Sequence, residues 1–290
     1  MADVVALTPD RLELGEGGRW VGDRLILVDI PAGRLLTTST PPTPGEGRLT
    51  ELAKLDDPLA TVAPVAGTAD TWLAATGTGF ALLKDGRAEH LVSPQAVTTK
   101  PWRMNDGVAD PAGRFWVGSM ACDQSPKAGA LYRLDPDGSV RIVVRDLTIT
   151  NGPAFTPDGR TMFLSDTPLG HVDRFDVDPA TGEVSGRRPF LRLDPADGAP
   201  DGMTLDVEGH LWVALFGAAA VHRYRPDGEL DRRVPVPARQ PTSVCLVGST
   251  LVVTSGRGGL DDPGPDDGAV MVTDAGVDGV PALPARLDRI

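Results

Sequence analysis

Short runs of alternating apolar and polar residues recur along the chain, and a turn sequence precedes each run. The clearest copies are D-P-A-G-R-F-W-V-G from Asp110, T-P-D-G-R-T-M-F-L-S-D from Thr156 and D-V-E-G-H-L-W-V-A from Asp206. Weaker copies begin at Val21, Ala66 and Val247. The glycine of each clear copy supplies the positive φ of a tight turn, and alternation with a period of two is typical of a β-strand. Each copy therefore predicts a hairpin turn that leads into a strand.

The spacing of these copies predicts the fold. Successive copies start roughly 40 to 50 residues apart, which is the period of a four-stranded propeller blade. Further alternating stretches at 130–134 and 221–224 lie between copies, and we find no helix of three turns or more. Six such units predict an all-β protein, a six-bladed β-propeller of four-stranded antiparallel blades around a central channel, with residues 1–290 as one domain. The alternative is a β-sandwich or a two-domain β protein with evenly spaced strands.

Closure of the ring is a further expectation. A propeller hides its strand edges only if the first and last blades meet. We therefore expect residues 6–12 to pair with the other strands of the last blade.

Composition and charge exclude several classes of partner. The 34 glycines and 27 prolines are spread along the chain, which favours many short strands over a low-complexity segment. A net charge of −12 argues against binding to a nucleic-acid backbone. No apolar stretch approaches the roughly 18 residues of a membrane helix, and the start lacks the pattern of a secretion signal. We expect a cytoplasmic protein, a monomer or weak homo-oligomer, that acts on a small molecule.

Four polar segments are not explained by turns and packing alone. They are L-G-E-G-G-R-W (14–20), R-M-N-D-G (103–107), T-N-G-P (150–153) and P-D-G-M (200–203). Each places an oxygen-bearing side chain beside a glycine just before a blade repeat, and these side chains are Glu16, Asn105, Asn151 and Asp201. Any one of them is a common turn signal, but the repeated phase favours convergence on the channel axis. Carboxylate and amide oxygens suit a hard cation such as Ca²⁺, Mg²⁺ or Mn²⁺.

Cysteine and histidine do not form a second candidate centre. Cys122 and Cys245 lack C-x-x-C spacing, and we expect both to be buried, reduced thiols. The four histidines are scattered, so a Cys/His zinc site is not predicted, and His210 and His222 are expected at the surface or between strands. The segment 257–268, rich in Gly, Pro and Asp, is either a solvated loop, a loop at the channel mouth or a second weak cation site.

At these segments the chain resembles the gluconolactonase, regucalcin (senescence marker protein) and luciferin-regenerating-enzyme family of six-bladed propellers. The matching stretches are L-G-E-G-G-R-W, R-M-N-D-G-V-A-D-P-A-G-R-F-W-V-G-S-M, N-G-P-A-F-T-P-D-G-R-T-M-F-L-S-D-T and P-D-G-M-T-L-D-V-E-G-H-L-W-V-A. They extend from about residue 14 to about residue 215, and a weaker echo, Q-P-T-S-V-C, begins at Gln240. The resemblance therefore covers most of the chain.

The resemblance implies a set of site residues. Glu16, Asn151 and Asp201 would ligate one divalent cation, and Asp201 would also be the general base. Arg103 and Asn105 would contact the hydroxyls or carbonyl of the substrate. Family members bind Ca²⁺ most readily, and several work with Zn²⁺, Mn²⁺ or Mg²⁺.

Two positions depart from the family pattern. The resemblance also implies a substrate contact at Asp123, where the family usually has Glu, a longer side chain. Gly18 replaces the Pro that commonly follows in L-G-E-G-P, a change that leaves Glu16 in place.

The function implied is metal-dependent hydrolysis of a sugar lactone or a similar cyclic ester. The cation would polarise the lactone carbonyl, Asp201 would take a proton from water, and Arg103 would add positive charge near the oxyanion. As an alternative, Arg103 is an ion-pair partner of Asp106 or Glu16. Two other functions are alternatives to a lactonase: a calcium-dependent phosphotriesterase of the fluorophosphatase type, and a non-enzymatic calcium-binding propeller.

Overall fold

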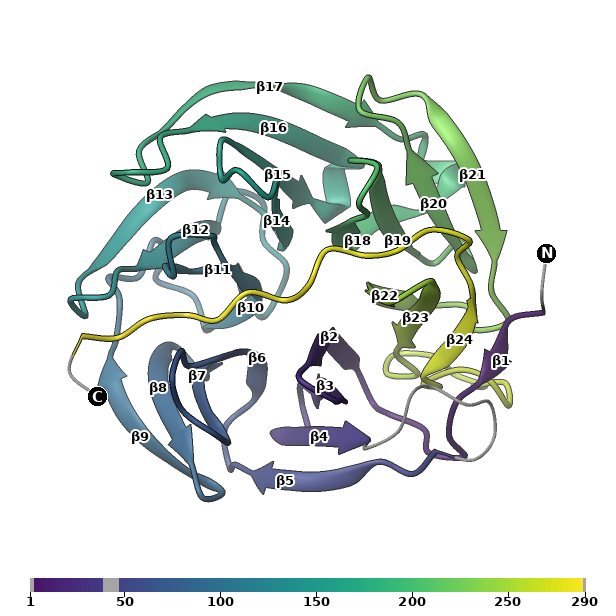
Figure 1. The fold of residues 1–290 in the computed structure, drawn as a ribbon, viewed down its shortest axis with the longest axis horizontal. Helices are drawn as coiled ribbons and strands as arrows, with labels where there is room; N and C mark the ends of the chain where they lie inside the picture. Colours follow the sequence, from purple (N-terminus) through teal and green to yellow (C-terminus); the bar gives the residue numbers. More distant parts are fainter. Residues whose placement is uncertain (1–2, 39–46, 289–290) are drawn as a thin grey trace.

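The chain forms six four-stranded antiparallel sheets arranged as the blades of a ring (Figure 1). A computed structural model describes residues 3–38 and 47–288. In these residues the helices are two short 3-10 turns, η1 (Thr167–Leu169) and η2 (Pro195–Asp197). Neither has the length or the apolar character to cross a membrane. The predicted six-bladed propeller is confirmed.

In five blades the four strands follow one another in the chain, and the first of them lies beside the channel (Figure 1). The first blade holds β2 (Gly15–Val21), β3 (Arg24–Asp29), β4 (Arg34–Thr38) and β5 (Thr50–Lys54). The second holds β6 (Leu59–Pro64), β7 (Thr71–Thr76), β8 (Gly79–Lys84) and β9 (Arg87–Val92). The third holds β10 (Trp102–Ala109), β11 (Phe115–Ala121), β12 (Gly129–Leu134) and β13 (Val140–Leu147).

The remaining blades repeat this arrangement. The fourth holds β14 (Thr150–Phe155), β15 (Thr161–Asp166), β16 (His171–Val177) and β17 (Val184–Arg192). The fifth holds β18 (Ala199–Leu205), β19 (Leu211–Phe216), β20 (Ala220–Tyr224) and β21 (Leu230–Pro235). The sixth holds β22 (Pro241–Val247), β23 (Thr250–Ser255) and β24 (Met271–Asp274), with β1 (Val5–Ala6) as its outer strand.

The ring closes through the start of the chain. β1 pairs antiparallel with β24, with Val5 opposite Val272. The backbone N–H of Leu7 donates to the carbonyl of Val270 at 2.8 Å, and that of Leu12 donates to Gly268 at 2.8 Å. The predicted pairing of residues 6–12 with the last blade is therefore confirmed.

Apolar side chains fill the space between neighbouring blades. Trp72 of β7 packs with Ile26 and Val28 of β3, and Trp212 of β19 packs with Val253 of β23. All of these side chains are almost fully buried. Burying an aliphatic side chain of this size stabilises a fold by about 1.5–3 kcal/mol. Contacts between blades therefore hold the inner strands, and the side chains they carry, around one axis.

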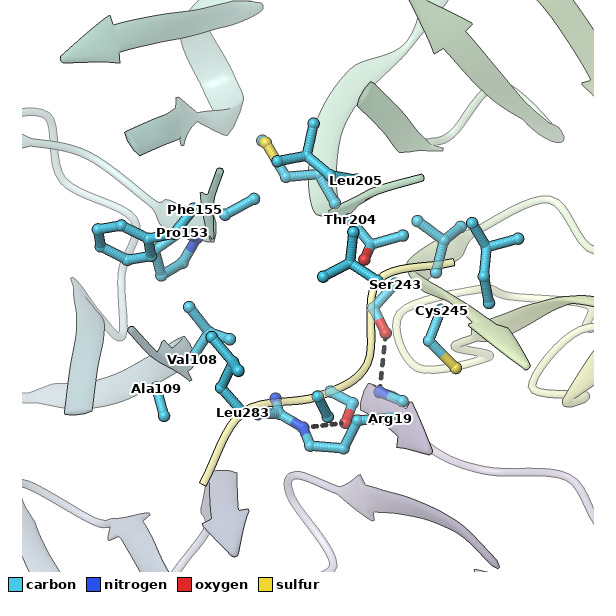
Figure 2. A pocket seen from close by; sticks show the side chains of 18 of the residues that line it. Arg19, Val108, Ala109, Pro153, Phe155, Thr204, Leu205, Ser243, Cys245 and Leu283 are labelled. Carbon is cyan, nitrogen blue, oxygen red and sulfur yellow. Dashed lines mark hydrogen bonds between the residues drawn. The ribbon is translucent and has the colours of Figure 1, made fainter. Parts of the chain in front are cut away.

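Residues 279–288, here called the strap, cross one end of the channel (Figure 1). The N–H of Val280 donates to the carbonyl of Leu205 at 3.3 Å, that of Ala285 to Pro64 at 2.8 Å and that of Arg286 to Gly113 at 2.8 Å. Three blades are thus connected by one segment. Under the strap lies a cavity of about 110 Å³, and the side chain of Leu283 forms part of its wall (Figure 2). The sequence did not predict this crossing.

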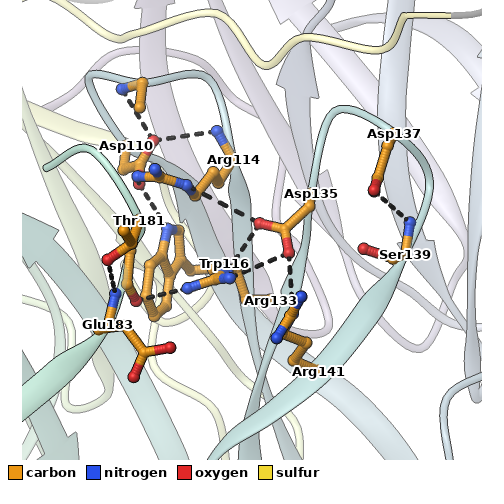
Figure 3. Close-up of polar contacts among 12 residues, drawn as sticks. Asp110, Arg114, Trp116, Arg133, Asp135, Asp137, Ser139, Arg141, Thr181 and Glu183 are labelled. Atoms are coloured by element: carbon orange, nitrogen blue, oxygen red, sulfur yellow. Dashed lines mark hydrogen bonds and ion pairs between the residues drawn. The ribbon is translucent and has the colours of Figure 1, made fainter. Parts of the chain in front are cut away.

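The repeated turn motif has a structural role that Figure 3 shows in the third blade. Asp110 accepts hydrogen bonds from the backbone N–H of Arg114 at 2.9 Å, from its Nη1 at 3.1 Å and from Trp116 Nε1 at 3.0 Å. In the fifth blade Asp206 accepts from Trp212 Nε1 at 2.9 Å. The aspartate therefore ties its turn to the tryptophan that the following strand buries. Trp116 is fully buried in the core.

Candidate functional site

The inner strand of each blade carries one extra residue at the level of the polar segments. Its pairing with the second strand shifts there, between Glu16 and Arg19, Leu59 and Thr61, Met104 and Gly107, Asn151 and Ala154, Pro200 and Met203, and Pro241 and Ser243. Such bulges bend a strand and redirect its side chains. Glu16 and Asn151 form the last pair before their bulges, whereas Asn105 and Asp201 lie within theirs. The bulges explain how side chains from different blades turn toward one axis.

Hydrogen bonds and charge interactions connect these side chains into one cluster, here called the channel site. It consists of Arg19, Arg103, Asn105, Asn151, Glu16, Asp106 and Asp201. Asn105 Nδ2 donates to Asn151 Oδ1 at 2.5 Å. The carboxylates of Glu16 and Asp201 repel each other, and the guanidinium of Arg103 attracts both. The structure therefore brings together every predicted site residue except Asp123.

The three carboxylates of the channel site are buried, with exposed fractions of 4% for Glu16, 7% for Asp106 and 5% for Asp201. Burial raises the pKa of all three. For Glu16 the negative charges of Asp201 and Asp106 raise the pKa further, and for Asp201 the charge of Asp106 does so. Ionised carboxylates at these positions need positive charge nearby.

The two amides are held in a fixed orientation. Arg103 Nη1 donates to Asn105 Oδ1 at 2.6 Å and to the carbonyl of Met104 at 2.8 Å. Asn151 Nδ2 donates to Thr167 Oγ1 at 2.9 Å. Arg103 makes no ion pair among the described residues. The alternative of a close Arg103–Asp106 or Arg103–Glu16 ion pair therefore does not hold. The attraction between Arg103 and Glu16 acts over a longer distance.

Sequence reasoning missed Asp106 and Arg19. Asp106 accepts from the N–H of Gly107 at 2.8 Å and from that of Gly152 at 3.0 Å, so it joins β10 to β14 at the residue that follows Asn151. Arg19 donates from Nη2 to Thr61 Oγ1 and to the carbonyl of Gly107, both at 3.0 Å. Asp106 stands in N-D-G and Arg19 follows G-G, two sequences that turns explain as well.

Asp123 lies outside the channel site. It follows β11, its side chain is 54% exposed, and it pairs with Lys100 at 2.7 Å. Its other described partner is Ser125, whose hydroxyl donates at 2.6 Å. Hydrogen bonds from Lys100 and Ser125 lower the pKa of Asp123 to about 2. A substrate contact at Asp123 stays a prediction, and such a contact would compete with Lys100.

Two other titratable groups, His222 and Asp267, have structural partners. His222 Nδ1 lies 2.8 Å from the hydroxyl of Tyr224, as expected for a histidine between strands. Asp267, in the 257–268 loop, is bound by Arg239 Nε at 2.8 Å and by the N–H of Gly264 at 2.8 Å. The second-cation alternative had four candidate carboxylates, Asp261, Asp262, Asp266 and Asp267, and an arginine occupies the last of them.

The prediction of two buried cysteines was wrong for one of them. Cys245 is buried, but Cys122 is exposed. Cys122 follows directly after β11, in the same loop as Asp123, where solvent reaches its side chain. Both are free thiols.

The donor set of the channel site fits a divalent cation. Asp201 Oδ1 is buried without a hydrogen-bond partner among the described residues. Buried oxygens without partners are costly, so such an atom indicates a missing positive group. Within 3–38 and 47–288 no three His, Cys, Asp or Glu side chains are placed to hold a metal by themselves. The carbonyl oxygen of Asn151 would therefore have to complete the set with Glu16 and Asp201.

The cavity under the strap adjoins the channel site. Its polar wall consists of Arg19, Asp106, Ser243 and Cys245, and Leu283 of the strap lines the same cavity (Figure 2). The side chain of Arg103 belongs to the other end of the inner strands, where it stays partly exposed. The strap and its cavity therefore lie at the end of the inner strands opposite to Arg103.

Comparisons with known proteins agree with this architecture. The profile of the SMP-30/Gluconolactonase/LRE-like region matches residues 14–257. Regucalcin of Bos taurus is 33% identical over 291 residues, covering 93% of this chain and 94% of that protein. The structure of a luciferin-regenerating enzyme matches with a TM-score of 0.89 and 29% identity, over 99% of this chain and 100% of that one. A calcium-binding protein, regucalcin, from Agrobacterium tumefaciens matches with a TM-score of 0.89 and 28% identity, over 99% and 98% of the two chains.

Proposed function

The chain belongs to the SMP-30/gluconolactonase/LRE-like family, and we propose that it is a divalent-cation-dependent lactonase that opens a sugar lactone or a similar cyclic ester. One observation carries the proposal: Asp201 Oδ1 is buried without a partner among residues 3–38 and 47–288, and it lies among carboxylates whose pKa values are raised by burial and by each other. An unneutralised arrangement of this kind is unfavourable for the fold alone. It is explained if the chain binds a cation there.

Glu16, Asn151 and Asp201 hold the cation, with Ca²⁺ as the first candidate and Zn²⁺, Mn²⁺ or Mg²⁺ as the others. A relative of similar fold is described as a calcium-binding protein, and the oxygen donors are those that hard cations prefer. When bound, the cation polarises the lactone carbonyl and stabilises negative charge on its oxygen. Three carboxylates face two guanidinium groups in the channel site, so a divalent ion changes the local excess of charge from negative to positive.

Asp201 is the general base. Water attacks the carbonyl carbon, and Asp201 takes the proton that the water loses. The bond between the carbonyl carbon and the ring oxygen then breaks, and the same proton goes to the departing oxygen. The product is an open hydroxy acid, which releases a proton to solvent near neutral pH. A carboxylate next to a cation is a weak base, so an activated ester such as a lactone suits this site better than an amide.

Arg103 and Asn105 orient the substrate. The Arg103 guanidinium is partly exposed and lies close enough to Glu16 and Asp201 to influence their pKa values. It adds positive charge beside the carbonyl oxygen as negative charge develops there. Asn105 receives a hydrogen bond from Arg103 and donates one to Asn151, so it links the substrate side of the site to the cation side.

The test is a metal-dependent lactone assay on matched variants. Asp201→Asn should lower kcat/KM by roughly 100-fold or more, because it removes both a ligand and the base. Asn151→Ala should raise the cation concentration needed for activity. Asp158→Asn, an exposed aspartate in the T-P-D-G turn, is the control and should keep full activity. Full activity in Asp201→Asn with an intact fold would refute the site.

A substrate panel separates the alternatives. Acid release from glucono-, galactono- and arabinono-lactones is measured beside hydrolysis of an aryl phosphotriester with Ca²⁺, Mn²⁺, Mg²⁺ or Zn²⁺. Faster turnover of a lactone supports the proposal. Faster turnover of the phosphotriester favours the phosphotriesterase alternative, and tight cation binding without turnover of either favours a calcium-binding role.

A further inference from the structure

A chain of side-chain hydrogen bonds runs through three blades on one side of the channel site. It begins at Arg103, passes through Asn105 and Asn151, and continues from Asn151 Nδ2 to Thr167 Oγ1 at 2.9 Å. Thr167 Oγ1 then donates to the carbonyl of Pro200 at 2.8 Å. The next residue is Asp201, so the chain connects the amides of the third and fourth blades to the carboxylate of the fifth.

The direction of this chain is fixed from the Pro200 end. A backbone carbonyl can only accept, so the single hydroxyl proton of Thr167 is used in donating to Pro200. Thr167 Oγ1 can then only accept from Asn151, which must present its NH₂ group to Thr167. The carbonyl oxygen of Asn151 consequently points to the opposite side. Such networks determine which way an amide faces.

Thr167 is itself held firmly. It is the first residue of η1, it is 8% exposed, and its N–H donates to the carbonyl of Ile149 at 3.1 Å. Gly170 closes the turn with φ 65°, donating its N–H to the carbonyl of Thr167 at 3.0 Å. The hydroxyl therefore occupies one position relative to β14 and β18. A residue fixed in this way can orient its neighbour.

We propose that Thr167 is a positioning residue for the cation site: its hydroxyl fixes the carbonyl oxygen of Asn151 toward the cation. The inference rests on the proposed function, because Asn151 is a ligand only if a cation binds. Without the hydroxyl, only the bond from Asn105 Nδ2 orients this amide. A turn that brings the NH₂ group toward the cation then replaces the ligand oxygen by partial positive charge. Removing such an outer partner of a metal ligand typically weakens metal binding by about 10- to 100-fold.

The chain offers matched variants. Thr167→Val keeps the side-chain shape and removes the hydroxyl, whereas Thr167→Ser keeps the hydroxyl. Ser165→Ala removes the other donor to the Pro200 carbonyl, which lies 2.7 Å from Ser165 Oγ, and leaves Asn151 untouched. Comparison of the three variants separates the effect of the Thr167–Asn151 hydrogen bond from the effect of the hydrogen bonds to the Pro200 carbonyl.

Calcium binding to the metal-free chain is measured by titration calorimetry. Thr167→Val should raise the Kd for Ca²⁺ by about 10- to 100-fold. Thr167→Ser and Ser165→Ala should stay within about threefold of the parent, since neither removes the partner of the Asn151 NH₂ group. Unchanged affinity in Thr167→Val while Asn151→Ala loses binding would overturn this inference alone. Absence of binding by the parent chain would overturn the proposed cation site and this inference with it.

A second measurement needs no cation. In the metal-free parent, the side-chain NH₂ protons of Asn151, followed by NMR after assignment with Asn151→Ala, should exchange slowly with solvent because they are donated to Thr167 in a buried position. In Thr167→Val they should exchange at least about tenfold faster. Equal exchange in a folded Thr167→Val variant would contradict the role of Thr167. If Thr167→Val fails to fold, fast exchange in Thr167→Ser would do the same.

Discussion

The three carboxylates of the channel site differ in what stabilises their negative charge. Both oxygens of Asp106 accept backbone N–H groups, from Gly107 and Gly152. Glu16 has one such bond, from Gly17 at 3.0 Å. Asp201 has a buried oxygen with no partner in the described part of the chain. Asp106 is therefore a structural carboxylate, whereas Glu16 and Asp201 keep oxygen atoms available for a cation or a proton.

Stability should depend on pH and cation together. Raised pKa values mean that folded Glu16 and Asp201 bind protons more tightly than the unfolded chain does. Their contribution is unfavourable at pH above their raised values and is relieved as pH falls toward their ordinary range near 4. Mild acid should therefore reduce the destabilisation that these two carboxylates cause in the metal-free chain. Ca²⁺ competes with these protons, so saturating Ca²⁺ should raise the melting temperature by about 5 °C at pH 8 and by much less at pH 5.

The same electrostatics predicts a stabilising mutation. In EDTA at pH 8, Asp201→Asn should melt at a higher temperature than the parent, because it removes a buried negative charge beside Asp106 and Glu16. The gain from Ca²⁺ should vanish in this variant, and Asp158→Asn should match the parent in both conditions. A lower melting temperature for metal-free Asp201→Asn would contradict the repulsion described here.

Individual site residues were predictable only where their neighbours in sequence were unusual. Asn151 and Asp201 stand beside glycines in a phase that repeats from blade to blade. Thr167 lies in the turn after the second strand of its blade and matches no repeated segment. Its role follows from a contact across 16 positions of the chain, to Asn151. Such a contact depends on how the turn after β15 folds back toward β14 in the same blade, which local sequence does not encode.

At the scale of elements, strands were predictable and bulges were not. The alternating runs gave the positions of strands such as β11 and β19. The bulges sit at the same level in all six inner strands of the described chain, but their sequences differ, with Gly17–Gly18 in β2 and Asn105–Asp106 in β10. Register depends on the partner strand as well as on local residues. Sequence phase therefore indicated the site, and pairing with the second strand determined its geometry.

The turn aspartates that bind a buried tryptophan should contribute more to the free energy of unfolding than exposed turn aspartates do. An asparagine at position 110 has only one side-chain oxygen that can accept. Arg114 or Trp116 Nε1 therefore loses a buried hydrogen-bond acceptor in Asp110→Asn. We expect a loss of about 2–3 kcal/mol, seen as a lower urea midpoint with an unchanged slope. Asp137→Asn, an exposed turn aspartate of the same blade (Figure 3), is the control and should leave the midpoint unchanged. Equal midpoints for the two variants would contradict this role.

At the scale of the molecule, the count of blades and the closure of the ring followed from the sequence. Six copies at nearly even spacing leave few other arrangements, and closure by the start of the chain is what a ring requires. The strap did not follow. Its residues show no alternation, and it contacts three blades through isolated hydrogen bonds of residues such as Val280 and Ala285. Each contact depends on where distant turns lie after the ring has formed.

The strap also covers the sulfur atom of Cys245, so opening of the strap can be measured by labelling this thiol. Cys245 lines the cavity under the strap, and burial raises the pKa of its thiol to about 12, whereas Cys122 is exposed. A disulfide reagent in excess should therefore modify the folded chain in two phases, and in a Cys122→Ser background only the slow one should remain. Ala285→Pro removes the N–H that binds Pro64 and should speed this phase about tenfold.

Arg286→Ala keeps every backbone bond of the strap and is the control for this labelling experiment. If Cys245 of the parent reacts as fast as Cys122, the strap does not protect the cavity from solvent. Otherwise the labelling rate of one sulfur atom reports how often the closed end of the ring opens to solvent, in a chain that carries its own probe.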